Sequence, residues 1–152
     1  MTNLEVTLVT TPDAMGQALA VRRAVFIDEQ GVPESLEVDE HDGDPAGVST
    51  ARHVLVTIDG APVATGRLLL HSAHDHAHIG RVAVLRDHRG RGAGRAVMLT
   101  LQAVARQHGY VGITLAAQLH AIGFYERLGY SVYGDVFLDA GIEHRWMDLE
   151  FA

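Results

Sequence analysis

The chain has 152 residues, a net charge of −7, 47% hydrophobic and 20% charged residues, and no cysteine. These values are typical of a single globular domain over residues 1–152, and they exclude a disordered chain, disulfides and thiolate chemistry. All 12 basic residues are arginine, which excludes lysine chemistry, and the acidic balance argues against nonspecific nucleic-acid binding. We find no apolar run of about 20 residues and no signal peptide, so we expect no membrane association and a cytoplasmic location.

The first half of the chain predicts a strand, a helix and a β-hairpin. Residues 4–9 alternate as a strand, and the N-cap signal at Thr11 and Pro12 then predicts a helix to about Asp28. An irregular acidic stretch over 31–50 follows. Two strands joined by an Asp-Gly turn are predicted after it, at 52–58 and 62–70.

The second half predicts two more helices among four strands. A histidine-rich connection over 71–78 leads to a strand at 79–85, and a glycine-rich turn then opens a helix that ends near 108–109. The remaining elements are a strand at 111–116, a short helix at 121–128 and two strands at about 130–137 and 144–150. The order β-α-β-β-β-α-β-α-β-β predicts an α/β (α+β) domain, with one mixed sheet and helices on its faces.

The glycine-rich turn over residues 89–95 is the most informative local signal. It reads Arg-Gly-Arg-Gly-Ala-Gly-Arg and joins a strand to a helix, where unpaired amides and the helix dipole favour an anion. A P-loop would need Gly-Lys-Ser/Thr at its end, and the dinucleotide pattern G-x-G-x-x-G is also missing. The turn therefore predicts binding of a small phosphorylated ligand.

A second segment, Ala117–Tyr130, combines with this turn into a known pattern. The turn fits Arg/Gln-x-x-Gly-x-Gly/Ala, and the downstream segment ends in Phe-Tyr-x-x-x-Gly-Tyr. Together they resemble the acetyl-CoA site of the GNAT superfamily of N-acetyltransferases. Residues 23–30 and 139–144 are similar to its ElaA-like branch, and the resemblance covers nearly the whole chain.

The resemblance implies a GNAT-like, mostly antiparallel sheet of about seven strands, in which the central strand splays from its neighbour. Pantetheine would pair with the opened strand, and turn amides would hold the pyrophosphate of acetyl-CoA. The cofactor-binding residues that it implies are Val82, Ala83, Val84, Arg89, Gly90, Arg91, Gly92, Ala93, Gly94, Arg95, Gln118 and Tyr125.

Tyr125 is also the implied general acid, which would protonate the departing CoA thiolate. Its helical spacing with Phe124 and Leu128 fits a core tyrosine equally well without the resemblance. Many relatives carry a carboxylate base early in the central strand, but Gly80 and Arg81 stand there in this chain. Candidate bases elsewhere are Glu29, Glu37, Asp39 and His144, acting directly or through water, and each of them also fits a solvated or structural residue.

The acceptor side is predicted from the acidic stretch, which carries eight carboxylates between Asp28 and Asp44. Negative charge there would attract a protonated amine, although a solvated acidic loop explains the same pattern. The expected substrate-binding residues are Phe26, Glu29, Glu37, Asp39 and His78. His71, His74 and His76 lie in an exposed connection without a supporting ligand pattern, so no metal is expected to be required.

The sequence thus predicts an acetyl-CoA-dependent N-acetyltransferase that transfers acetyl directly to a primary amine, which we expect to be a small molecule. The alternatives are a CoA-binding sensor without turnover and, more weakly, an Arg/Gly-rich RNA-binding module. Neither a nucleic acid nor a membrane is expected as a partner. The oligomeric state stays open between monomer and a homodimer formed through the C-terminal strands.

Overall fold

Seven strands form one sheet in the computed structural model, which describes residues 3–71 and 73–152. Their order across the sheet is β1-β2-β3-β4-β5-β7-β6, and only the β4–β5 pair is parallel. The strands are β1 (Leu4–Leu8), β2 (Ala51–Ile58), β3 (Ala61–Leu69), β4 (His76–Val84), β5 (Gly112–Gln118), β6 (Ser131–Asp139) and β7 (Ile142–Glu150). The predicted mixed, mostly antiparallel sheet of seven strands is confirmed.

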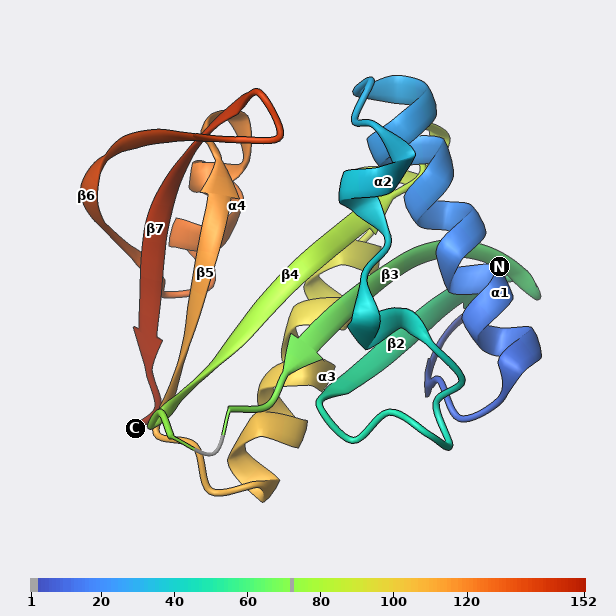
Figure 1. The fold of residues 1–152 in the computed structure, drawn as a ribbon, viewed down its shortest axis with the longest axis horizontal. Helices are drawn as coiled ribbons and strands as arrows, with labels where there is room; N and C mark the ends of the chain where they lie inside the picture. Colours follow the sequence, from blue (N-terminus) through green and yellow to red (C-terminus); the bar gives the residue numbers. More distant parts are fainter. Residues whose placement is uncertain (1–2, 72) are drawn as a thin grey trace.

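Helices cover both faces of this sheet (Figure 1), with α1 and α2 on one face and α3 on the other. None of the helices in the described part of the chain has the length and hydropathy needed to span a membrane. The helical segments are α1 (Pro12–Arg22), η1 (Arg23–Glu29), α2 (Glu34–Glu37), η2 (Glu40–Asp42), η3 (Arg86–His88), α3 (Ala93–Gln107), η4 (Leu119–Ala121) and α4 (Ile122–Arg127).

The first helix begins where the sequence predicts but changes its winding before it ends. The Thr11 hydroxyl accepts from the Ala14 amide at 3.1 Å, which is the predicted N-cap. From Arg23 to Glu29 the chain is a π-helix, and the Gln30 amide donates to the Val25 carbonyl five residues back. Such wide turns are rare and are frequent at functional sites. Nothing in the sequence pattern indicated it.

The main core lies between the sheet and α3. Val97, Met98 and Leu101 are fully buried on one side of this helix, which is the face that its apolar spacing predicts. At Gly66 on β3 a Cβ atom would lie 2.3 Å from Val97 Cγ1, so glycine is what allows the helix to pack this closely.

Strands β4 and β5 pair only at their beginnings and then diverge. The parallel ladder joins His76, Ala77 and His78 to residues 112–114, and β5 continues to Gln118 against β7 alone. Figure 1 shows the resulting V between β4 and β5. The predicted splay of the central strand is therefore present. Strand β4 also begins earlier than predicted, so that three residues of the histidine-rich connection, His76, Ala77 and His78, belong to the sheet.

A β-bulge interrupts β4 just beyond the point of divergence. The β3–β4 register shifts between Thr65 and Arg67, opposite Arg81, whose φ of 53° is in the left-handed region. A bulge adds one residue to a strand and re-aims the side chains that follow. Here it turns β4 away from β5 while keeping its pairing with β3.

Gly112 stands where β4, β5 and β7 meet, and it leaves no room for a side chain. A Cβ there would lie 2.3 Å from the Leu149 carbonyl oxygen and 2.8 Å from the His76 ring. We expect Gly112→Ala to destabilise the protein by about 1–3 kcal/mol or more, through overpacking against backbone. Urea unfolding followed by circular dichroism measures this.

Gly16→Ala is the matched control. Gly16 lies in α1, and a Cβ added there would have nothing within 4 Å, so alanine should stabilise by about 0.5–1 kcal/mol. Equal effects of the two substitutions would contradict the packing argument at Gly112.

Candidate active site

The glycine-rich turn lies at the start of α3, as predicted. Gly90 and Gly92 have φ values of 78° and 86°, and Gly92 is the N-cap residue of the helix. Within the described residues, the amides of residues 90–95 donate to no protein acceptor. Arg91 and Arg95 are exposed beside them. Unpaired amides at a helix N-terminus suit a phosphate group.

Gly94 brings this turn against α4. A Cβ at Gly94 would lie 3.3 Å from Phe124 Cζ and 3.5 Å from Val84 Cγ2, which leaves little space for a side chain. The Phe124 ring in turn packs edge-on against Tyr125, with centroids 5.0 Å apart. The two sequence segments that carried the resemblance are thus in direct contact.

The edge of β4 that faces the V has no neighbouring strand beyond His78. The Leu85 amide donates to the Val63 carbonyl on β3. Residues of an antiparallel strand alternate in the edge to which their N–H and C=O groups point, so those of Val84 point away from β3. The Val84 carbonyl accepts there from Arg89 Nε at 3.0 Å. Ala83 differs from the prediction, because its side chain is buried toward α1 and its residue pairs with β3.

Tyr125 is buried in the wall of this site and keeps its proton. Burial raises the pKa of Tyr125 to about 12, and only 8% of the residue is exposed. Its hydroxyl makes no hydrogen bond to the described residues, whereas the nearby Tyr130 hydroxyl donates to Gln102 Oε1 at 2.8 Å. Tyr125 is therefore an uncommitted, protonated donor at neutral pH.

Gln118 bridges the two sides of the V. Its amide exchanges two hydrogen bonds with the Gln30 amide, of 3.0 and 3.1 Å, from the end of β5 to the residue that follows the π-helix. The predicted role of Gln118 did not include this partner, which is 88 positions away. The pair joins the halves of the molecule at the mouth of the opening.

Glu29 is held in an ion pair with the glycine-rich turn. Its two carboxylate oxygens accept from Arg89 at 2.7 and 2.9 Å, and Arg86 lies 3.6 Å away. The hydrogen bond from Arg89 lowers the pKa of Glu29. A carboxylate with a lowered pKa and both oxygens paired is a poor proton acceptor, so the arrangement disfavours Glu29 as a base.

His144 lies opposite Gln118 in the β5–β7 ladder, next to the same opening. Its Nδ1 is 2.7 Å from the Ile142 carbonyl, and a carbonyl can only accept, so Nδ1 carries the proton. In the neutral ring Nε2 is then left with the lone pair. The ring also stacks on Phe137, with centroids 5.8 Å apart. This geometry leaves one nitrogen of His144 free to take a proton.

Three acids of the acidic segment, Glu37, Asp39 and Asp42, form an ion cluster with two arginines, while Glu34 and Glu40 stay exposed. Arg22, only 1% exposed, bonds Glu37 at 2.6 Å and Asp42 at 2.7 Å. Arg67 bonds Asp39 at 2.9 Å. Burial acts to raise the pKa of Asp42, but the hydrogen bonds from Arg22 and the Asp39 amide hold it well below its usual range. Glu37 and Asp39 are thus neutralised by arginines.

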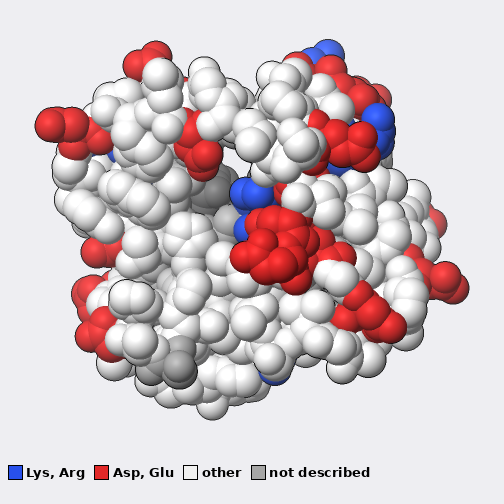
Figure 2. Space-filling view, in the orientation of Figure 1, with Lys and Arg blue, Asp and Glu red and all other residues white. Residues whose placement is uncertain are grey.

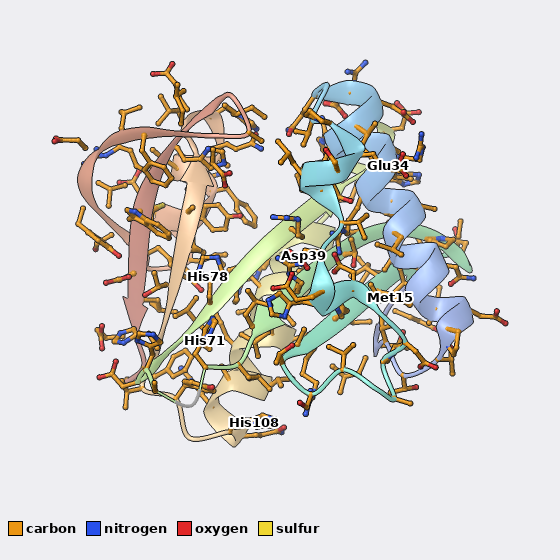
Figure 3. All side chains as sticks on the ribbon, viewed as in Figure 1. Met15, Glu34, Asp39, His71, His78 and His108 are labelled. Atoms are coloured by element: carbon orange, nitrogen blue, oxygen red, sulfur yellow. The ribbon has the colours of Figure 1, made fainter. Side chains whose placement is uncertain are left out.

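The remaining predicted acceptor residues, Phe26 and His78, have different surroundings. Phe26 packs in the π-helix against the small cluster of Val21, Val25 and Ala83. His78 lines a cavity of about 350 Å³ together with the histidine-rich connection, Thr114 and Trp146. In Figure 3, His78 and Asp39 are seen on either side of β4. Figure 2 shows a hollow between the two halves of the molecule, and arginine and acidic atoms lie side by side at its edge.

The comparison with protein families identifies this arrangement. Residues 19–130 match the model of the acetyltransferase (GNAT) family. The chain belongs to this family. The matched range includes the π-helix, the acidic segment, the glycine-rich turn and Tyr125, so every element of the site except the β6–β7 hairpin falls inside it.

Individual relatives of this GNAT protein agree with the family. An uncharacterized N-acetyltransferase of Bacillus subtilis, YjcF, is 35% identical and covers 89% of this chain and 91% of its own length. An acyl-CoA N-acyltransferase structure from Pseudomonas aeruginosa is 32% identical over 96% of this chain and 99% of its own, with a TM-score of 0.79. Escherichia coli ElaA has a TM-score of 0.81 at 27% identity, over 97% and 100% of the two chains.

The buried ion cluster generates a prediction for stability. Asp42→Asn leaves the buried charges of Arg22 and Arg67 without their shared partner, so we expect a loss of about 3–5 kcal/mol in urea unfolding at pH 7. Glu40→Gln, at an acid whose side chain is 81% exposed, should change stability by less than about 0.5 kcal/mol.

The same cluster sets a pH dependence. The lowered folded-state pKa of Asp42 means that its stabilisation is complete above the unfolded pKa, about 3.9, and is lost as the pH falls toward the folded value. Wild-type stability should therefore decline below about pH 4 more steeply than that of Asp42→Asn. Parallel acid limbs for the two proteins would contradict this assignment.

Proposed function

We propose that this protein transfers the acetyl group of acetyl-CoA directly to the nitrogen of a primary amine. The observation that carries the proposal is that the unpaired amides of residues 90–95 adjoin the open edge of β4, with Gly94 packed between Val84 and the Phe124 ring that contacts Tyr125. The donor would supply an acyl carbon activated as a thioester.

The donor would lie along β4 from the glycine-rich turn to the V. The amides of residues 90–95, with Arg91 and Arg95, would hold the pyrophosphate, as helix N-termini do for phosphates. Val82 and Val84 would pair with the amide groups of pantetheine as an added strand does. We give Arg89 and Glu29 a positioning role, because their ion pair ties the turn to the π-helix.

The chemistry needs one proton to leave the nitrogen and another to reach the sulfur. The amine nitrogen bonds to the acetyl carbon, the carbon–sulfur bond breaks, and the Tyr125 hydroxyl gives its proton to the departing thiolate. His144 Nε2 accepts the nitrogen's proton, directly or through one water, and exchange with solvent restores both side chains. An amide N–H of β4 next to the thioester would stabilise the oxyanion.

The proposal is tested by release of free thiol from acetyl-CoA, with mass detection of the acetylated product, over a panel of primary amines. We expect turnover with at least one class of amine. Binding of acetyl-CoA without thiol release from any amine would instead favour the alternative of a CoA-binding sensor.

Tyr125→Phe tests the assignment of the general acid. We expect kcat to fall by about 10²-fold with little change in the KM of acetyl-CoA, because the ring stays and only the proton donor is lost. Tyr133→Phe, at a half-exposed tyrosine on β6, is the matched control and should keep wild-type kcat. Undiminished turnover in Tyr125→Phe would reject this role.

A further inference from the structure

Two arginines flank the glycine at which β4 leaves β5. Arg67 on β3 lies opposite Gly80 in the β3–β4 ladder, and Arg81 follows Gly80 in the bulge. Arg81 contacts the acidic segment, with Nε 3.1 Å from the Glu37 carbonyl and Nη2 3.3 Å from the Leu36 carbonyl. Both guanidinium groups therefore lie on the face of the sheet that carries His78, opposite α3.

The carboxylates of the cluster leave part of these guanidinium groups without a partner. Glu37 and Asp39 lie 3.6 and 3.7 Å from Arg81 but make their close hydrogen bonds to Arg22 and Arg67. Arg81 Nη1 has no acceptor within the described residues. Arg67 Nε has none either, although Arg67 is only 4% exposed.

The electrostatic surroundings of Arg81 favour an additional anion. Burial lowers the pKa of Arg81, and the positive charges of Arg67 and Arg22 lower it further, more than Glu37 and Asp39 raise it. A carboxylate placed here would offset that repulsion, and a guanidinium binds a carboxylate through two parallel hydrogen bonds. Figure 2 shows arginine atoms exposed at the edge of the hollow.

The wall next to these arginines carries a neutral histidine and aromatic rings. Burial, and then the charge of Arg67, lower the pKa of His78 to about 4, so its ring is neutral at pH 7. His78 meets Trp146 edge-on at 6.1 Å, and Trp146 stacks on Phe137 at 5.1 Å. The His78 Nε2 lies 3.6 Å from where a Cβ of Gly80 would be, so the ring leans toward Gly80.

We propose that the acceptor is an amine carrying a carboxylate close to its nitrogen, as an α-amino acid does. Arg81, with Arg67 beside it, would bind the carboxylate, and the apolar part of the acceptor would lie against His78 and Trp146. The nitrogen would then be held near Gly80, where the thioester would lie. This inference rests on the proposed acetyl transfer and names its acceptor class.

The test compares acceptors that share a carbon skeleton and differ in the carboxylate. Leucine, leucinamide and 3-methylbutylamine form one series, and phenylalanine, phenylalaninamide and 2-phenylethylamine form another. We expect kcat/KM to be at least about tenfold higher for the amino acid than for the other two members, as loss of a charged hydrogen bond predicts. The amides have more free amine at neutral pH, so amine reactivity alone would give the opposite order.

Arg81→Gln then tests the residue. The ratio of kcat/KM for amino acid over uncharged amine should fall at least about tenfold, while the KM of acetyl-CoA stays within about twofold. Arg106→Gln removes the same charge from an exposed position at the last turn of α3, and the ratio should not change. Thermal unfolding checks that both variants are folded. The comparison of acceptors with the wild-type protein does not depend on either variant.

The outcomes separate the two proposals. Equal kcat/KM for all three members of each series overturns the carboxylate inference and leaves acetyl transfer in place, as does an unchanged ratio in folded Arg81→Gln. Thiol release with other amines but with neither series also overturns the inference alone. No thiol release with any amine overturns both.

Discussion

The divergence of β4 from β5 is the constraint on which the rest of the site depends. Three residues of each strand pair in parallel, and beyond them the peptide groups on one edge of β4 have no neighbouring strand. Backbone groups in a folded protein need partners, so an opened sheet edge is a binding surface for an extended polar chain. Gly112 fixes where the strands meet, and the bulge at Arg81 directs where they part.

Opening the sheet weakens the connection between its two halves, and several contacts compensate for this. The Gln30–Gln118 amide pair spans the mouth of the V, and the His76 ring bonds Glu150 where the strands still pair. On the other side, Arg22 holds the acidic segment over β4 through Glu37 and Asp42. Because that cluster is buried, it fixes the position of Arg81 as well as of the segment.

The fold changes the interpretation of the acidic sequence pattern, because it shows which carboxylates are paired with arginines. Carboxylates between residues 28 and 44 predicted a surface that attracts cations, yet the nearest arginines bind Glu37, Asp39 and Asp42 and leave guanidinium donors unpaired. The number of charged residues can be read from the sequence. Which of them form ion pairs depends on which side chains the fold buries together. The acceptor hollow therefore favours an anionic group next to the reacting nitrogen, a property that the net charge of −7 conceals.

What the sequence determined by itself is the local structure, including the glycine-rich turn at the start of α3. The Thr11 cap, the glycine-rich turn and the Phe124-Tyr125 pair act through their nearest neighbours, so their patterns predicted elements that the fold contains. Only the tertiary structure decided the partners of Gln118, Glu29 and Arg81, which are 88, 60 and 44 positions away. Such contacts depend on how elements that are distant in the sequence pack against one another, and a local sequence pattern does not predict this packing. The acceptor side consists of contacts of this kind, so the fold was needed to see it.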